Sequence, residues 1–185
     1  CTAITLALVL LLCLTACGGG QQSAGADTGA AADAAAPRAK DSVVIAIVSE
    51  PETLDPTKGW GHGNSPIVQS TLVKYTSELT FANDLAVDYS LSEDGLTWTF
   101  TIRDDACFTD GERVTASDVA FTLETAKAAQ GSVDLTYMAS AEALDETTVA
   151  VTLLQPTSIF LNTVASVGIV PEHAYSEDYG RAPIG

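Results

Sequence analysis

Hydrophobic and polar side chains alternate with a period of two in residues 96–102. The apolar positions are Leu96, Trp98, Phe100 and Ile102, and threonine or arginine stands between and after them. This period places the apolar side chains on one face, so we predict a half-buried antiparallel strand. Asp110 and Gly111 follow, and this pair tolerates the positive φ values of a tight reversal, so a turn is expected there.

A helix is predicted directly after this turn. The Thr115 hydroxyl can cap the helix while Asp118, three residues later, reaches back to the amide of the cap. This pattern is a capping box, and we expect about three helical turns, through Lys127.

Weaker patterns predict the remaining elements. Residues 43–48 are apolar on both faces, as in a strand covered on both sides. Ser65 and Pro66 can begin an amphipathic helix, because apolar residues follow at helical spacing; these are Val68, Leu72, Tyr75 and Leu79. Residues 141–144 and 148–153 predict a hairpin that turns at Asp145 and Glu146. We expect a short helix from Pro156, with Ile159, Phe160 and Val164 on it, and a last strand over 167–170. Helices and strands mix without a regular βαβ alternation, which indicates an α+β domain.

The first seventeen residues predict export. The apolar run from Ala3 to Leu14 is shorter than the roughly 20 residues of a membrane-spanning helix. It ends in Leu14-Thr15-Ala16-Cys17, which resembles a bacterial lipobox, and the resemblance implies that Cys17 is acylated after cleavage. A plain secretory signal or an anchor helix is the alternative. Since no Met or basic stretch precedes the run, we expect the sequence to begin inside its signal peptide.

Residues 18–41 predict a disordered tether, because Gly, Ala, Ser, Gln and Asp dominate and few side chains could build a core. A coil of this length reaches roughly 25–30 Å. An alanine-rich helix is the alternative. The domain organisation is therefore a signal peptide at 1–17, a tether at 18–41 and a folded part at 42–185.

The net charge limits the classes of molecule that the protein can bind, and the cysteine content limits its disulfide bonds. The formal net charge of −16 excludes nucleic acid and disfavours adsorption to anionic lipid, so membrane association would come from the lipid on Cys17. Only Cys107 would remain in the mature protein without a modification, so no intrachain disulfide is expected. We predict that Cys107 is a small buried residue and not a reactive thiol.

Residues 94–119 resemble the signature segment of the family 5 solute-binding proteins, the dipeptide, oligopeptide and nickel receptors of ABC importers. The matching positions are Asp94, Gly95, Thr97, Trp98, Thr99, Phe100, Phe108, Asp110, Gly111, Thr115, Ala116, Asp118 and Val119. Thr109 departs from the usual His, and Cys107 is unusual. Two further matches are Glu50-Pro51 with Thr53-Leu54-Asp55-Pro56, and Val170-Pro171, His173 and Pro183-Ile184-Gly185.

The resemblance implies a two-lobed clamshell fold. Residues 42–185 would form part of the first lobe with its small inserted subdomain, and the second lobe would lie outside this sequence, which is expected to be truncated at both ends. The signature identifies the architecture, because such turns and caps usually contact other parts of the chain and no ligand.

One segment has the chemistry of a binding site. In residues 59–65 the glycines allow a ligand to approach the backbone closely. Trp60 offers a stacking face and His62 offers an imidazole, and Asn64 is the third candidate ligand-binding residue. The start of the helix predicted at Pro66 would add free N–H groups for an anion. A flexible surface loop with an incidental histidine is the alternative.

Catalytic and metal-binding patterns are missing from the sequence. It has no Gly-x-Ser-x-Gly, His-Glu-x-x-His or Gly-Lys-Ser/Thr motif. His62 alone cannot hold a metal, and His173 is expected in a turn, so nickel would arrive already chelated and no cofactor is expected. The sequence therefore predicts a monomeric, lipid-anchored extracytoplasmic receptor that passes a peptide or metal chelate to an ABC permease. The alternative is an adhesive or structural surface lipoprotein without a transported solute.

Overall fold

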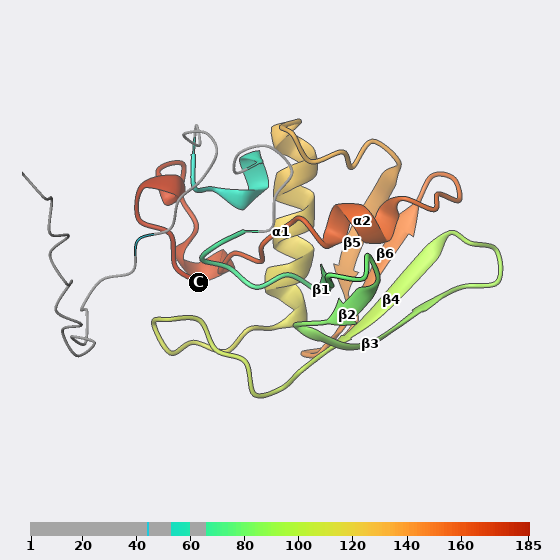
Figure 1. Cartoon of the computed structure of the whole chain (residues 1–185), viewed down its shortest axis with the longest axis horizontal. Helices are drawn as coiled ribbons and strands as arrows, with labels where there is room; N and C mark the ends of the chain where they lie inside the picture. The colour runs from blue at the N-terminus through green and yellow to red at the C-terminus, as the bar shows by residue number, and fades with distance from the viewer. Residues whose placement is uncertain (1–43, 45–52, 60–65) are drawn as a thin grey trace, which may run out of the picture. The chain divides into compact units, whose positions relative to one another are not determined.

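The computed structural model describes Val44, residues 53–59 and residues 66–185 (Figure 1). The elements in chain order are the 3-10 helix η1 (Pro56–Lys58), strands β1 (Val73–Tyr75), β2 (Phe81–Asn83), β3 (Ala86–Leu91) and β4 (Thr97–Ile102), helix α1 (Ala116–Ala129), strands β5 (Met138–Ala143) and β6 (Thr148–Leu153), helix α2 (Phe160–Val164), and the 3-10 helices η2 (Glu172–Ala174) and η3 (Tyr179–Arg181). Helices and strands are mixed without βαβ repeats, which confirms the α+β class. Within the part of the chain described, no helix is long and apolar enough to cross a membrane.

The main sheet has four antiparallel strands in the order β3-β4-β6-β5, and β1 and β2 form a separate two-stranded sheet. The predicted alternation in β4 is confirmed, because its apolar side chains are buried and its threonines are partly or fully exposed. Trp98 lies opposite Val151 of β6, and Phe100 lies opposite Val149. The apolar face of the sheet therefore continues from one central strand to the next.

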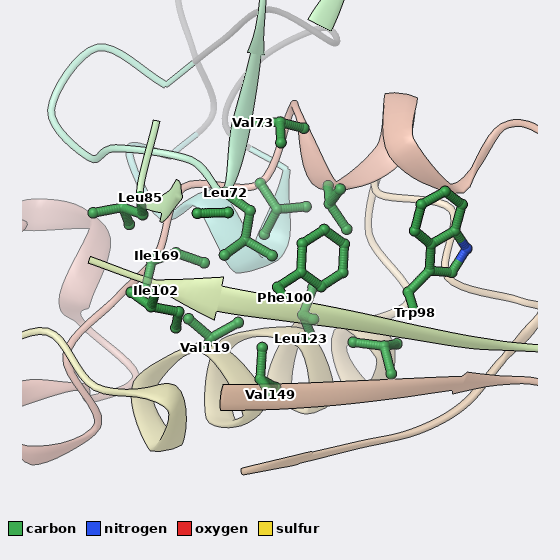
Figure 2. Close-up of a cluster of buried hydrophobic side chains, with 14 of the residues drawn as sticks. Leu72, Val73, Leu85, Trp98, Phe100, Ile102, Val119, Leu123, Val149 and Ile169 are labelled. Carbon is green, nitrogen blue, oxygen red and sulfur yellow. The ribbon is translucent and has the colours of Figure 1, made fainter. Parts of the chain in front are cut away.

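The core lies on this apolar face. Figure 2 shows Val119 and Leu123 of α1 in one cluster with Phe100 and Val149 of the sheet. These four side chains are completely buried. Burial of a side chain of this size stabilises a fold by about 1.5–3 kcal/mol, so this face holds the domain together.

The turn and the helix of the signature segment are confirmed. Gly111 has a φ of 94°, and its N–H donates to the Phe108 carbonyl over 2.9 Å, which closes the predicted turn. Thr115 is the N-cap of α1, and both halves of its capping box with Asp118 are present. The helix has 14 residues and ends two residues beyond the predicted end. The hairpin of β5 and β6 is also confirmed.

The helix predicted from Pro66 is wrong. Residues 66–72 are irregular, and β1 and β2 follow as a hairpin. Tyr75 and Leu79 share the apolar spacing, but both are exposed, and Leu79 has a φ of 60° in the turn between the strands. The adjacent residues Leu72 and Val73 are both fully buried, which a helix with one apolar stripe does not require.

Residues 167–170 do not form the predicted strand, although all four residues are buried. The Ile169 N–H donates to the Ser70 carbonyl over 2.9 Å, and the Val170 N–H donates to the Thr122 hydroxyl over 3.0 Å. Since one of these partners is a side chain, no ladder of backbone bonds develops.

Three further predictions differ from the structure or lie largely outside the described residues. The short helix α2 exists and buries Phe160 and Val164, but it begins four residues after Pro156, and Ile159 before it is 48% exposed. Cys107 is exposed, so its predicted burial is wrong. Of the strand expected at 43–48, only Val44 lies among the described residues, where it is exposed and outside any strand.

Side chains of α1 cover the outer edge of the main sheet. β5 is an edge strand, and the Ala141 N–H donates to the Glu124 carboxylate over 2.7 Å. The Lys127 ammonium donates to the Ala139 carbonyl over 2.6 Å and lies 3.8 Å from Glu124. The helix therefore occupies hydrogen-bonding groups that an unpaired edge would leave free.

Candidate functional site

The predicted ligand-binding residues Trp60, His62 and Asn64 lie outside the described residues, as does the predicted lipidation site Cys17. The structure describes the chain on both sides of residues 60–65. We call residues 53–59 the Asp55 segment and residues 167–185 the C-terminal segment. The contribution expected from a helix start at Pro66 is ruled out, since no helix begins there.

The Asp55 segment is built around one buried carboxylate. Asp55 is completely buried and is the N-cap of η1. Its Oδ1 accepts hydrogen bonds from the Thr57 N–H over 3.0 Å and from the Thr57 hydroxyl over 2.7 Å. The Asp55 N–H donates to the Thr53 hydroxyl over 3.0 Å. These local bonds fold the segment into a short turn, because an aspartate before Pro-Thr can satisfy the backbone N–H groups that follow it.

Tyr175 connects this carboxylate to the C-terminal segment. Its hydroxyl donates to Asp55 Oδ2 over 3.0 Å and lies 2.8 Å from the Thr57 hydroxyl. Burial raises the pKa of Tyr175, and the Asp55 charge adds to this effect, so the hydroxyl keeps its proton at neutral pH. The ring packs edge-on against Phe121 of α1, with the ring centroids 5.3 Å apart. The hydroxyl is thereby held in place as a donor to Asp55.

Lys58 makes a second, more exposed connection between the two segments. Its ammonium lies 3.4 Å from Asp55 Oδ2 and donates to the Glu177 carbonyl over 3.1 Å. The Lys58 side chain is 43% exposed, so solvent weakens this ion pair. The Tyr175 contact is part-buried and is therefore less exposed to solvent than the Lys58 contact.

The other side of residues 60–65 is also held by the C-terminal segment. A Cβ placed on Gly168 would lie 2.8 Å from Pro66 Cγ and 2.7 Å from Gln69 Cβ, so only glycine allows this approach. The Gln69 amide donates to the Tyr179 hydroxyl over 3.4 Å, and this hydroxyl donates to the Ile184 carbonyl. The C-terminal segment therefore contacts the chain on both sides of residues 60–65.

Signature residues also bind the C-terminal segment. Asp118 accepts from Thr115 with Oδ2 and from the Glu172 N–H with Oδ1, the latter over 2.9 Å. His173 Nε2 lies 2.7 Å from Asp110 Oδ2. The hydrogen bond to the Asp110 carboxylate, together with the charge of that carboxylate, raises the pKa of His173, and the same bond lowers the pKa of Asp110. His173 is thus part of a turn, as expected, and the signature residues described here contact other parts of the chain.

Sequence reasoning gave no role to Tyr175 or Thr57. Asp55 enters the sequence analysis only through the family resemblance, although an aspartate followed by Pro-Thr also indicates a side-chain capped turn. Tyr175 lies 120 residues away from its partner Asp55, and no local pattern predicts such a pairing. In the described ranges, no group of three or more His, Cys, Asp and Glu side chains could hold a metal ion.

Comparisons with known proteins place these features in a family context. The profile of the bacterial extracellular solute-binding proteins, family 5 Middle, matches residues 80–185. Protein XP55 of Streptomyces lividans is 36% identical over 160 residues, which are 80% of this chain and 29% of that protein. The probable D,D-dipeptide-binding periplasmic protein DdpA of Escherichia coli K12 is 34% identical over 158 residues, 76% of this chain and 31% of DdpA.

The fold is also similar to a solved structure. NikZ from Campylobacter jejuni, in complex with Ni(L-His), superposes with a TM-score of 0.68 at 28% sequence identity. The match covers 74% of this chain and 30% of NikZ. The chain thus spans about 30% of the length of the proteins that it resembles here, in agreement with the expected fragment of a clamshell protein.

Proposed function

Because the chain belongs to family 5 of the bacterial extracellular solute-binding proteins, we propose that it captures a peptide or a nickel chelate for an ABC importer. The profile match over residues 80–185 is the observation that carries this proposal. DdpA is named for D,D-dipeptides and the NikZ structure contains Ni(L-His), so both classes of solute are candidates. The proposed role is binding and delivery to a permease, without covalent chemistry.

The proposed mechanism is closure of two lobes around the solute. A solute shifts an equilibrium between open and closed forms by the difference in its affinity for them. The described residues would belong to the first lobe. Their contribution is rigid support, since Asp55, Tyr175 and Gly168 fix the chain on both sides of residues 60–65.

Within this proposal, Trp60, His62 and Asn64 contact the solute. We expect His62→Gln to weaken solute binding, because the imidazole offers both a hydrogen-bonding group and a metal ligand. His173→Gln is the matched control, since His173 is paired with Asp110 in a turn. Equal affinities of the His62→Gln variant and the unmodified protein would remove His62 from the site.

We also propose that Cys17 carries the lipid that anchors the protein to the outer face of the cell membrane. The support is the lipobox-like Leu14-Thr15-Ala16-Cys17 and the acidic net charge of −16, which offers no attraction to anionic lipid. When cells that express the protein are grown with a clickable fatty acid, the protein should become labelled. Cys17→Ala should abolish the label, whereas Cys13→Ala should retain it; labelling of the Cys17→Ala variant would contradict the anchor.

The solute proposal is tested with the product of the complete reading frame, starting at Gly18. Its melting temperature is measured with dipeptides, D,D-dipeptides, oligopeptides, nickel alone and nickel with L-histidine. A solute at about 100 times its Kd stabilises the folded state by roughly 2.7 kcal/mol, which shifts the melting temperature measurably. A shift with one class identifies the solute. No shift with any of them would refute both assignments and favour an adhesive or structural surface protein.

A further inference from the structure

We propose that Asp110-Gly111 is a site of spontaneous isoaspartate formation and that the contact with His173 protects it. The sequence contains two Asp-Gly pairs, Asp94-Gly95 and Asp110-Gly111, and both aspartates are exposed. Aspartate isomerises most readily before glycine, because glycine places no side chain beside the attacking nitrogen. This modification goes beyond the proposed function and does not depend on the solute.

The reaction needs only water and moves one backbone bond. The Gly111 nitrogen attacks Asp110 Cγ and forms a new C–N bond, while the nitrogen loses its proton and a carboxyl oxygen leaves as water. Water then opens the resulting five-membered imide at one of its two carbonyl groups. Opening at the main-chain carbonyl leaves the chain connected through Cγ, which is isoaspartate, and the mass of the protein is unchanged.

Three contacts hold the reacting groups apart in the folded protein. The Gly111 N–H donates to the Phe108 carbonyl over 2.9 Å. Asp110 Oδ1 accepts from the Glu112 N–H over 3.1 Å, and His173 Nε2 lies 2.7 Å from Asp110 Oδ2. Both carboxylate oxygens are therefore bound, so rotation of the side chain toward the Gly111 nitrogen must break bonds. Packing adds no protection, because a Cβ placed on Gly111 would meet no atom within 4 Å.

Among these contacts, the one with His173 comes from a distant part of the chain, 63 residues away. Two neighbours hold His173 in place. Its ring packs edge-on against Phe108 with the ring centroids 6.1 Å apart, and the N–H of the preceding Glu172 donates to Asp118 over 2.9 Å. The position of His173 is thus fixed by groups other than Asp110, and the imidazole can restrain the Asp110 carboxylate.

Charge strengthens this protection. The bond to the Asp110 carboxylate raises the pKa of His173 above its usual 6.5, and the charges of Asp110, Asp118 and Glu112 add to the effect, so the ring is charged at pH 5.5. The same bond lowers the pKa of Asp110 and keeps its carboxyl group ionised. The ionised group reacts more slowly, because a carboxyl oxygen leaves most easily as water from the neutral acid.

Asp94-Gly95 offers the same chemistry without His173. Asp94 Oδ1 accepts from the Ser92 hydroxyl and from the Leu96 N–H, and the Gly95 N–H donates to the Ser92 carbonyl over 2.9 Å. All three bonds lie within the turn between β3 and β4. This pair is therefore an internal reference, which responds to unfolding of the domain and not to a change at His173.

The test compares four forms of the product of the complete reading frame, incubated at pH 5.5 and at a temperature where all of them stay folded. They are the unmodified protein, His173→Ala, Ser117→Ala and the double variant His173→Ala/Asp110→Glu. Ser117→Ala removes the hydrogen bond to the Glu172 side chain in η2 and leaves the pair of His173 and Asp110 in place. The longer side chain of the double variant cannot form a five-membered ring at position 110.

Trypsin separates the two Asp-Gly pairs for measurement. Its cleavage after Lys74, Arg103 and Arg113 gives the peptides 75–103 and 104–113, each with one pair. Chromatography resolves an isoaspartyl peptide from its aspartyl form, and electron-transfer fragmentation identifies the altered residue.

The amount of isoaspartate at residue 110, relative to residue 94, should rise about two- to fivefold in His173→Ala, because an exposed ion pair restrains its members only weakly. It should stay at the unmodified level in Ser117→Ala and vanish in the double variant. An unchanged ratio in His173→Ala overturns the proposal. So does an equal rise in Ser117→Ala, because loosening of η2 would then explain the effect.

Two further results would contradict the proposal. A parallel rise at residue 94 in His173→Ala would show that the domain unfolds and that His173 gives no local protection. Isoaspartate that persists in peptide 104–113 of the double variant would come from Asp104 or Asp105, and Asp110 would not be the site.

Discussion

Replacing Asp118 tests whether the signature segment supports the C-terminal segment. Asp118 is 6% exposed, and its carboxylate accepts three hydrogen bonds. Two of them come from Thr115 and close the N-terminus of α1, and the third comes from the Glu172 N–H. Asp118→Ala removes all three, whereas Thr115→Ala removes only the hydroxyl part of the capping box.

The expected magnitudes follow from these counts. Loss of an N-cap side chain costs about 1 kcal/mol, so Thr115→Ala should lower the free energy of unfolding by about that amount. Asp118→Ala additionally leaves the Thr115 and Glu172 N–H groups without their acceptor, and each such loss costs about 1–3 kcal/mol unless water replaces the acceptor. We expect a total of about 3 kcal/mol for Asp118→Ala. Asp118→Asn keeps one oxygen acceptor and should lie between the two variants.

Urea unfolding followed by circular dichroism measures these differences, provided that the denaturant dependence of the free energy is the same in all variants. A Ser117→Ala variant is the control, because the exposed Ser117 hydroxyl bonds only the Glu172 side chain in this region. If Asp118→Ala is no less stable than Thr115→Ala, the Glu172 contact contributes nothing and the reasoning is refuted.

Three other changes have defined outcomes. His173→Gln should lower the melting temperature at pH 5.5 and have little effect on it at pH 8.5. Asp110 raises the pKa of His173 above 6.5, so the stabilisation from the charged ring is complete below pH 6.5 and is lost as the pH rises through the raised pKa. A difference in melting temperature that does not depend on pH would contradict this. Gly168→Ala should lower the free energy of unfolding by about 1–3 kcal/mol, because its Cβ would lie 2.7 Å from Gln69 Cβ; a melting temperature equal to that of the unmodified protein would show that the neighbour moves freely. Cys107 should react with a maleimide in the folded protein, and Cys107→Ser should change the free energy of unfolding by less than about 0.5 kcal/mol, because the side chain is exposed; protection of the thiol would disprove the exposure.

The sequence predicts a feature correctly where the residues that determine it lie close together in the chain. The β4 alternation, the Asp110-Gly111 turn and the Thr115 cap each depend on residues within a few positions, and all three are confirmed. The helix predicted at Pro66 failed because four apolar residues happened to have helical spacing. Their burial is decided by tertiary packing, which places Leu72 in the core and leaves Leu79 in a turn.

The candidate site also combines features that local sequence determines with features that tertiary packing determines. The choice of Trp60, His62 and Asn64 stays a prediction, since these residues lie outside the described ranges. Of the support around them, only the local turn has a signal in the sequence, Asp55 before Pro-Thr, and the predictions made from the sequence did not include it. The pairing of Asp55 with Tyr175 depends on the path of the whole domain. The exposure of Cys107 has no signal in its sequence neighbours, because it depends on how the turn that carries the residue packs.

The side chains of Glu124 and Lys127 give the outer strand β5 a further property. A strand of another molecule can extend a sheet only where backbone donors and acceptors are available in register. Here the Ala141 N–H and the Ala139 carbonyl are already bonded to α1, so an incoming strand must first break two bonds that involve charged groups. Removing both side chains would therefore matter little for the monomer in dilute solution and most at high concentration, where β5 would become a template for aggregation.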